Sequence, residues 1–153
     1  MTTRLRHVAV VLAGGSGSRI GAELPKQLLE LAGRPIIEHT IAAFQAAPAI
    51  DEIVVVMVPG HLDAVREIVR RGDYTKVTTI VGGGDTRNAS TRAALAALPD
   101  DECNVLLHDA ARPLVTQSVI AAVVAALRPA AVHVTDAASV TAAHCAAVVP
   151  SSQ

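Results

Sequence analysis

Short apolar runs alternate with helix-patterned segments along most of this chain, and this alternation constrains the fold more than any other feature. Runs rich in Val, Ile and Leu cover 8–13, 53–58, 77–81 and 105–108. Such continuous runs are typical of strands buried on both faces of a sheet. Segments expected to be helices follow them, at 36–45, 62–69, 86–98 and 116–127, the last N-capped by Thr116. The alternation predicts an α/β fold, a Rossmann-like three-layer αβα arrangement around a mostly parallel sheet.

The chain is long enough for one domain and too short for two comfortable ones. It has 153 residues, of which 51% are hydrophobic, so it can bury a sizeable core. We expect a single domain over 1–153, with a clear pattern over 7–127 and an atypical tail over 128–153. Within that tail, 131–134 is a candidate fifth strand, whereas 137–149 is Ala-rich without a clear period.

Composition argues against several classes of protein. The formal net charge of −1 gives no electrostatic reason to expect nucleic acid or an anionic membrane as a partner, and the only aromatics, Phe44 and Tyr74, are too few for base stacking. Cys103 and Cys145 form no C-x-x-C pair, which argues against a zinc site or a disulfide framework. No apolar run approaches the roughly 18–20 residues of a membrane span. We therefore expect a soluble protein of the reducing cytoplasm.

A glycine-rich loop follows the first expected strand. Gly14, Gly15 and Gly17 lack side chains, so their backbone N–H groups can approach an anion closely. Arg19 and Lys26 add two positive charges beside that backbone. A triphosphate needs this combination, because fixed cations meet the charge that grows on leaving pyrophosphate. The alternative is a tight turn with solvated cations, but the proline–lysine pair that follows at a defined interval favours a polyphosphate site.

Two other nucleotide motifs fail on spacing. A P-loop requires a Gly-Lys pair, and the chain has none. A dinucleotide fingerprint would place a glycine three positions after Gly17, where Ile20 stands. The second expected strand is also closed by Pro59-Gly60, without an acidic residue. These departures argue against a hydride-transfer enzyme.

A second unusual segment, 82–90, follows the third expected strand. On the functional interpretation, the Gly84 backbone, Asp85 and Ser90 hydrogen-bond the edge of a nucleobase, and a small pyrimidine suits polar groups on a short loop. On the structural interpretation, glycines end the strand and Asp85 caps the next helix. Both interpretations stay open from this segment alone.

A third segment, 108–113, follows the fourth expected strand. Asp109 is a single carboxylate at a strand end, and beside a triphosphate it is placed to hold Mg²⁺, which prefers a carboxylate plus phosphate oxygens and retained waters. The guanidinium of Arg112 suits the phosphate of a second substrate. His108 is expected to be structural, because adjacent strand positions alternate and its side chain faces away from Asp109. In open parallel sheets ligands bind outside the carboxyl ends of the strands, so all three segments are expected at one edge.

Together these residues resemble the cytidylyltransferases that join CTP to a polyol phosphate, over about 8–127. The family includes enzymes acting on 2-C-methyl-D-erythritol 4-phosphate, in isoprenoid synthesis, and on D-ribitol 5-phosphate, in teichoic-type polymers. The resemblance is carried by Leu-Ala-Gly-Gly at 12–15, Pro-Lys-Gln at 25–27, Gly-Gly-Asp-x-Arg at 83–87 and His-Asp-Ala-Ala-Arg-Pro at 108–113. It implies a fold of the nucleotide-diphospho-sugar transferase type. It also implies in-line attack by the acceptor phosphate on the α-phosphorus of CTP, with Mg²⁺ as cofactor.

The resemblance also assigns roles to residues. Arg19 and Lys26 match residues that stabilise the transition state, Asp109 matches one at the metal, and Arg112 matches one that contacts the acceptor phosphate. The positions that match cytidine-nucleotide contacts are Ala13, Gly14, Gly15, Gly84, Asp85 and Ser90. The 12–15 opening and the 86–90 segment lean slightly toward a ribitol phosphate acceptor, whereas the pair Ala110-Ala111 is common in the methylerythritol branch.

One departure limits these expectations. A typical family member is longer, and its later part supplies a β-arm for homodimerisation and further groups near the metal and acceptor. Residues 130–153 cannot be matched to that part. The hypothesis is a C-terminally truncated member that binds CTP but turns over poorly. The alternatives are a non-catalytic CTP-binding module and another sugar-phosphate nucleotidyltransferase, such as one acting on hexose 1-phosphates.

Overall fold

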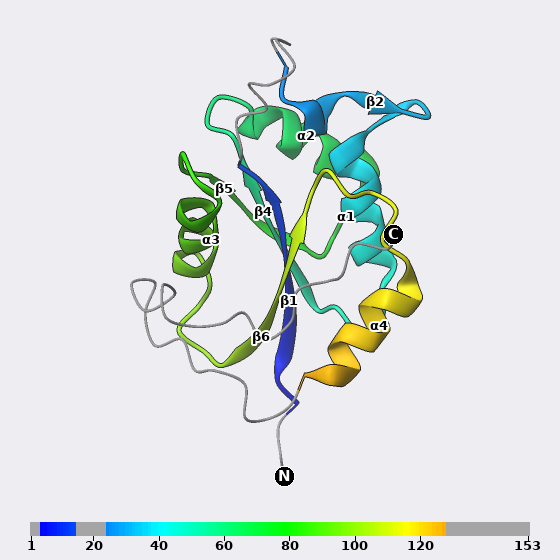
Figure 1. Cartoon of the computed structure of the whole chain (residues 1–153), viewed down its shortest axis with the longest axis vertical. Helices are drawn as coiled ribbons and strands as arrows, with labels where there is room; N and C mark the ends of the chain where they lie inside the picture. The colour runs from blue at the N-terminus through cyan, green and yellow to red at the C-terminus, as the bar shows by residue number, and fades with distance from the viewer. Residues whose placement is uncertain (1–3, 15–23, 128–153) are drawn as a thin grey trace.

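The computed structural model describes residues 4–14 and 24–127 (Figure 1). Its main sheet is parallel and contains β1 (Arg6–Ala13), β4 (Glu52–Met57), β5 (Val77–Gly82) and β6 (Cys103–Asp109). The helices are α1 (Ile36–Ala46), α2 (Leu62–Gly72), α3 (Arg87–Ala96) and α4 (Gln117–Ala126). The strand and helix positions expected from the apolar runs are confirmed, with shifts of a few residues at their ends.

The strands lie in the order β5-β4-β1-β6, so the first strand of the sequence is central. Val10 of β1 is in register with Val54 of β4 on one side and with Leu107 of β6 on the other. The chain moves outward from β1 through β4 to β5, and then returns to the far side of β1 to form β6. This reversal places the ends of β1 and β6 at the switch point of the sheet, where such folds bind ligands.

Two apolar layers cover the two faces of the sheet. On one face, Ile37, Ile41 and Phe44 of α1 pack with residues from α2 and α4 against alternate strand positions. On the other face, Ala94 of α3 packs against the intervening positions, such as Val10. Figure 1 shows α3 on one side of the sheet and α1 and α4 on the other. The three-layer αβα prediction is therefore confirmed.

A small hairpin precedes α1 and has no counterpart in the elements expected from sequence. It joins β2 (Glu30–Leu31) to β3 (Arg34–Pro35) after a short 3-10 helix, η1 (Lys26–Leu28). Its turn places Ala32 at φ 50° and Gly33 at φ 77°. Two-residue hairpin turns require such positive φ values, and Asn-Gly or Asp-Gly is their usual signal. The turn was not predicted from the sequence because alanine, at position 32, stands where Asn or Asp usually signals such a turn.

The helix starts supply one confirmation and one correction. Thr116 caps α4, because its hydroxyl accepts from the backbone N–H of Val119 at 3.3 Å. Asp85 does not cap α3: the cap is Thr86, whose hydroxyl accepts from the N–H of Ala89 at 3.0 Å. The candidate strand at 131–134 and the expected tail lie outside the described residues. Among the described helices, none is long and apolar enough to cross a membrane.

Candidate functional site

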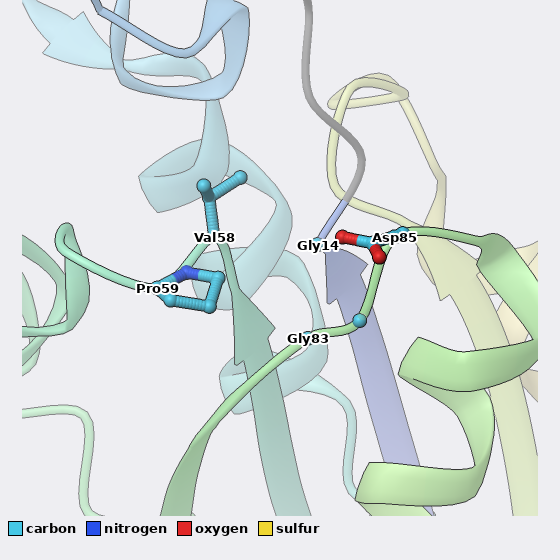
Figure 2. Close-up of a pocket in the computed structure, with 6 residues that line it drawn as sticks. Gly14, Val58, Pro59, Gly83 and Asp85 are labelled. Atoms are coloured by element: carbon cyan, nitrogen blue, oxygen red, sulfur yellow. The ribbon is translucent and has the colours of Figure 1, made fainter.

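The three unusual segments converge at the carboxyl edge of the sheet. Backbone hydrogen bonds join their starts to neighbouring strands: Gly83 N–H donates to the carbonyl of Met57 at 2.8 Å, and Ala110 N–H donates to that of Leu12 at 2.9 Å. A pocket of about 140 Å³ opens between the ends of β1, β4 and β5. It is lined by Gly14, Val58, Pro59, Gly83, Gly84 and Asp85. Figure 2 shows Val58 and Pro59 on one side of it, and Gly14 and the Asp85 carboxylate on the other.

The glycine loops touch each other at the base of this pocket. A Cβ added to Gly14 would lie 2.4 Å from Ser90 Oγ and 3.2 Å from Gly83 Cα. A Cβ added to Gly83 would lie 2.8 Å from Gly14 Cα. The two backbones therefore approach more closely than a side chain at either position allows, and both glycines line the pocket.

Ser90 lies beneath the loop after β5. It is 2% exposed, and its hydroxyl donates to the carbonyl of Gly84 at 3.4 Å. A Cβ on Gly84 would collide with Ala89 of the same helix turn, at 2.5 Å. The first turn of α3 thus fixes the path of the loop, and Ser90 supports the segment that also carries Asp85, which is exposed.

Asp109, the last residue of β6, is held by two arginines. Arg87 Nη1 donates to its Oδ1 at 2.9 Å, and Arg112 Nε lies 3.4 Å from its Oδ2. The Asp109 side chain is 36% exposed, and those of Arg87 and Arg112 are about half exposed. The sequence predicted Asp109 and Arg112 at one place, and the structure brings them together. Arg87, the first residue of α3, was not predicted there.

His108 points to the opposite face, as its strand position predicts. It is 4% exposed, its ring packs edge-on against Phe44 with centroids 5.3 Å apart, and Nε2 contacts the carbonyl of Arg112 at 2.9 Å. Burial lowers the pKa of His108, and this outweighs the opposing effect of the Arg112 carbonyl and Asp109. A neutral ring that donates to Arg112 fits this position, so His108 supports the loop that carries the site.

The remaining predicted residues divide into described and undescribed positions. Ala13 ends β1 with its side chain in the core, so only its backbone can face a ligand. Lys26 is exposed at the start of η1, and the next residue, Gln27, is buried with no hydrogen-bond partner for Oε1 among the described residues. Gly15 and Arg19 lie outside the described residues.

A match to a family model identifies the family of the chain. A family model described as 2-C-methyl-D-erythritol 4-phosphate cytidylyltransferase matches residues 7–149. The chain belongs to this family. The match runs past Leu127, where the clear sequence pattern ends. It confirms the resemblance inferred from the four motifs.

Relatives of this cytidylyltransferase family carry names with two different acceptors. A 2-C-methyl-D-erythritol 4-phosphate cytidylyltransferase of Thermobifida fusca is 52% identical over 126 residues, which cover 81% of this chain and 51% of that protein. A ribitol-5-phosphate cytidylyltransferase of Streptococcus agalactiae is 43% identical, covering 76% of this chain and 50% of that protein. The crystal structure of 4-diphosphocytidyl-2C-methyl-D-erythritol synthase from Anaerococcus prevotii superposes with a TM-score of 0.67 at 28% identity, covering 82% of this chain and 52% of that one. The chain therefore spans about half the length of these relatives.

The described residues of this family member could hold Mg²⁺ only together with oxygen atoms of a bound ligand. Across 4–14 and 24–127, no group of three or more His, Cys, Asp or Glu side chains could hold a metal by itself. Mg²⁺ usually binds through one or two carboxylates together with substrate phosphates and waters. Asp109, partly exposed at the switch point, fits that pattern, with nucleotide phosphates supplying the other oxygens.

Sequence reasoning missed three residues of the site: Val58 and Pro59 in the pocket wall, and Arg87 on Asp109. The sequence pattern indicated Pro59 only as the residue that ends the second expected strand. The available signal was positional, since every residue that directly follows a parallel strand lies at the ligand-binding edge.

Proposed function

We propose that this chain carries the CTP site of a cytidylyltransferase, which converts CTP and a polyol phosphate to a CDP-polyol and pyrophosphate. The observation that carries the proposal is the contact between Gly14 and Gly83 at the base of a pocket, in a chain of this family. The pocket lies beside the switch point, at the carboxyl ends of β1, β4 and β5, and three of its six lining residues are glycines, which suits a nucleotide that needs a close approach to the backbone.

The proposed roles follow the positions of the residues. Gly84 and Asp85 hold the edge of the cytosine, Ser90 supports their loop, and Val58 and Pro59 provide the apolar wall. The backbone of Ala13 and Gly14 faces the phosphates, and Gly15 is assigned to the same phosphates. Mg²⁺, held by Asp109 and the nucleotide, would neutralise phosphate charge. The proposal includes a cytoplasmic location and a homodimer.

The proposed reaction is an in-line displacement at phosphorus. A phosphate oxygen of the acceptor forms a bond to the α-phosphorus of CTP, while the bond from that phosphorus to the oxygen bridging to the β-phosphate breaks. The electron pair leaves with pyrophosphate, where Lys26 and Arg19 offset the growing negative charge. Arg112 orients the acceptor phosphate through its guanidinium fork.

The first experiment measures nucleotide binding and turnover with the same preparation. Calorimetry with CTP, UTP, ATP and GTP is expected to show a preference for CTP, and pyrophosphate release is followed with each of the two acceptor phosphates. CTP binding without release would select the non-catalytic module. A preference for a purine nucleotide would remove the proposed function and favour a hexose-1-phosphate enzyme. The acceptor that supports release decides between ribitol and methylerythritol phosphates.

Lys26 supplies the sharper test of mechanism. Lys26→Gln is expected to lower kcat by roughly 10²–10³, about 3–4 kcal/mol, because charge on pyrophosphate develops only in the transition state. CTP affinity should change much less. Lys76→Gln is the control, since Lys76 is the only other lysine and its ammonium donates to the carbonyl of Ala47, away from the site. Equal losses in both variants would contradict a catalytic role for Lys26.

A further inference from the structure

The pairing of Arg87 with Asp109 is the contact at this edge that the proposed roles leave unexplained. Its two residues come from different segments: Arg87 begins α3, and Asp109 ends β6. Arg87 Nη1 is 2.9 Å from Oδ1, a normal charge-assisted hydrogen bond. The contact of Arg112 with the other oxygen, Oδ2, is longer at 3.4 Å. One carboxylate oxygen is therefore firmly held and the other only loosely.

Helix stability does not account for the position of Arg87. It occupies the first position of α3, directly after the cap Thr86, and the first turn contains no acidic residue. A cation there opposes the helix dipole, so the position is unfavourable for helix stability. A residue that is unfavourable for its own helix is expected where it serves a functional site instead. The residue that Arg87 contacts is Asp109.

The same helix turn also packs against the loop at 83–85, which lines the pocket. Thr86 caps it through Ala89, Ala89 packs on Gly84, and Ser90 lies against Gly14. Arg87 therefore belongs to the helix turn that packs against the pocket-lining glycines, and its guanidinium reaches Asp109. The carboxylate is thereby oriented relative to the loop that holds the nucleotide.

We propose that Arg87 is a positioning residue that holds Oδ1 of Asp109 and so orients the carboxylate that would hold the metal accompanying the nucleotide. The inference rests on the proposed function. On this view, Arg87 touches neither the nucleotide nor the metal and acts through the carboxylate. The loose contact at Oδ2 leaves Arg112 available for the acceptor phosphate.

The test compares CTP affinity with Mg²⁺ and with EDTA, because their ratio isolates the contribution of the metal. Arg87→Gln is expected to reduce this Mg²⁺-dependent gain by about 10–100-fold, the usual effect of removing a group that orients a metal ligand. CTP affinity in EDTA and the midpoint of thermal unfolding should match those of the unaltered chain. Arg87→Lys should restore part of the gain, since an ammonium can still donate to Oδ1, and Asp109→Asn should abolish it.

Arg66→Gln is the matched control, because Arg66 is about as exposed as Arg87 (56% against 50%) and forms its ion pair, with Asp63, on α2. An unchanged Mg²⁺-dependent gain in Arg87→Gln would overturn the inference while leaving CTP binding intact. A loss of affinity in EDTA as well would also overturn it, by making Arg87 a direct nucleotide contact. If the unaltered chain binds no CTP under either condition, the proposed function fails and this inference fails with it.

Discussion

At the scale of single residues, Gly14 and Gly82 differ in the space around them, although both lie at strand ends. A Cβ on Gly14 would meet Ser90 at 2.4 Å, whereas a Cβ on Gly82 would meet only Pro59, at an ordinary 3.6 Å. Gly14→Ala is expected to cost about 1–3 kcal/mol of stability through overpacking. It should also weaken CTP binding by pushing the two loops apart. Gly82→Ala should leave both nearly unchanged.

Chemical denaturation and CTP calorimetry on the two variants check this prediction. Because both substitutions add the same single methyl group, composition cannot explain a difference between them. A Gly14→Ala protein with unaltered stability would show that the contact with Ser90 relaxes freely. In that case the glycine would not be needed for packing.

The buried His108 makes stability depend on pH. Burial holds its pKa in the folded chain below the ordinary 6.5, and the unfolded chain regains that ordinary value. Unfolding therefore takes up a proton in acid, so the stability from the neutral ring is present above about pH 6.5 and lost as the pH falls through the folded pKa. The slope from this one group is at most about 1.4 kcal/mol per pH unit.

His108→Gln should flatten that slope. Glutamine can still donate to the Arg112 carbonyl but does not titrate, so its free energy of unfolding should fall less between pH 7 and pH 5 than that of the unaltered chain. Its absolute stability is expected to be lower, because the packing against Phe44 is lost. Denaturant titrations at several pH values supply the slopes. Parallel curves for the two proteins would show that other groups set the acid sensitivity.

At the scale of elements, the start of α3 separates folding from ligand binding. Thr86 caps the helix, so Thr86→Ala should cost about 1 kcal/mol of stability. Asp85 is exposed, borders the pocket and does not cap the helix. Asp85→Ala should therefore weaken CTP binding with little change in stability. Measuring both properties for both variants checks the assignment, and a larger loss of stability in Asp85→Ala would reverse it.

At the scale of the whole molecule, the carboxyl and amino ends of the parallel strands differ in what they contain. The carboxyl edge carries the pocket, while a polar network closes the amino edge. There Arg6 of β1 contacts Glu52 of β4 and, at 2.7 Å, Asp101 just before β6, and Glu52 also accepts from Thr78 of β5. This network joins β1, β4, β5 and the segment before β6 at the end of the sheet that is remote from the candidate site.

Glu52→Ala should therefore lower the midpoint of thermal unfolding without changing the CTP dissociation constant of the folded protein. Glu52 is 9% exposed, and its removal takes away one of the two acidic partners of Arg6 and the carboxylate to which the Thr78 hydroxyl donates. Differential scanning calorimetry and CTP titration well below the unfolding range measure the two effects separately. A changed dissociation constant at low temperature would show that the two edges are coupled through the strands.

The sequence by itself determined the fold class, the parallel strands, most helices and the edge at which three motifs meet. It could do so because each of these depends on local patterns: apolar runs for buried strands, helical spacing for helices, and the rule that parallel strands share a carboxyl edge. It also placed His108 away from Asp109, because alternation along a strand needs only the neighbouring residue.

Only the tertiary structure decided how the site is assembled. The contact of Arg87 with Asp109, the wall formed by Val58 and Pro59, and the burial of Ser90 between two glycine loops each join segments far apart in the chain. Such contacts depend on strand order and on the face that each crossover helix covers. Periodicity within one segment does not report either property, since a local pattern records how deeply a residue is buried but not against which partner.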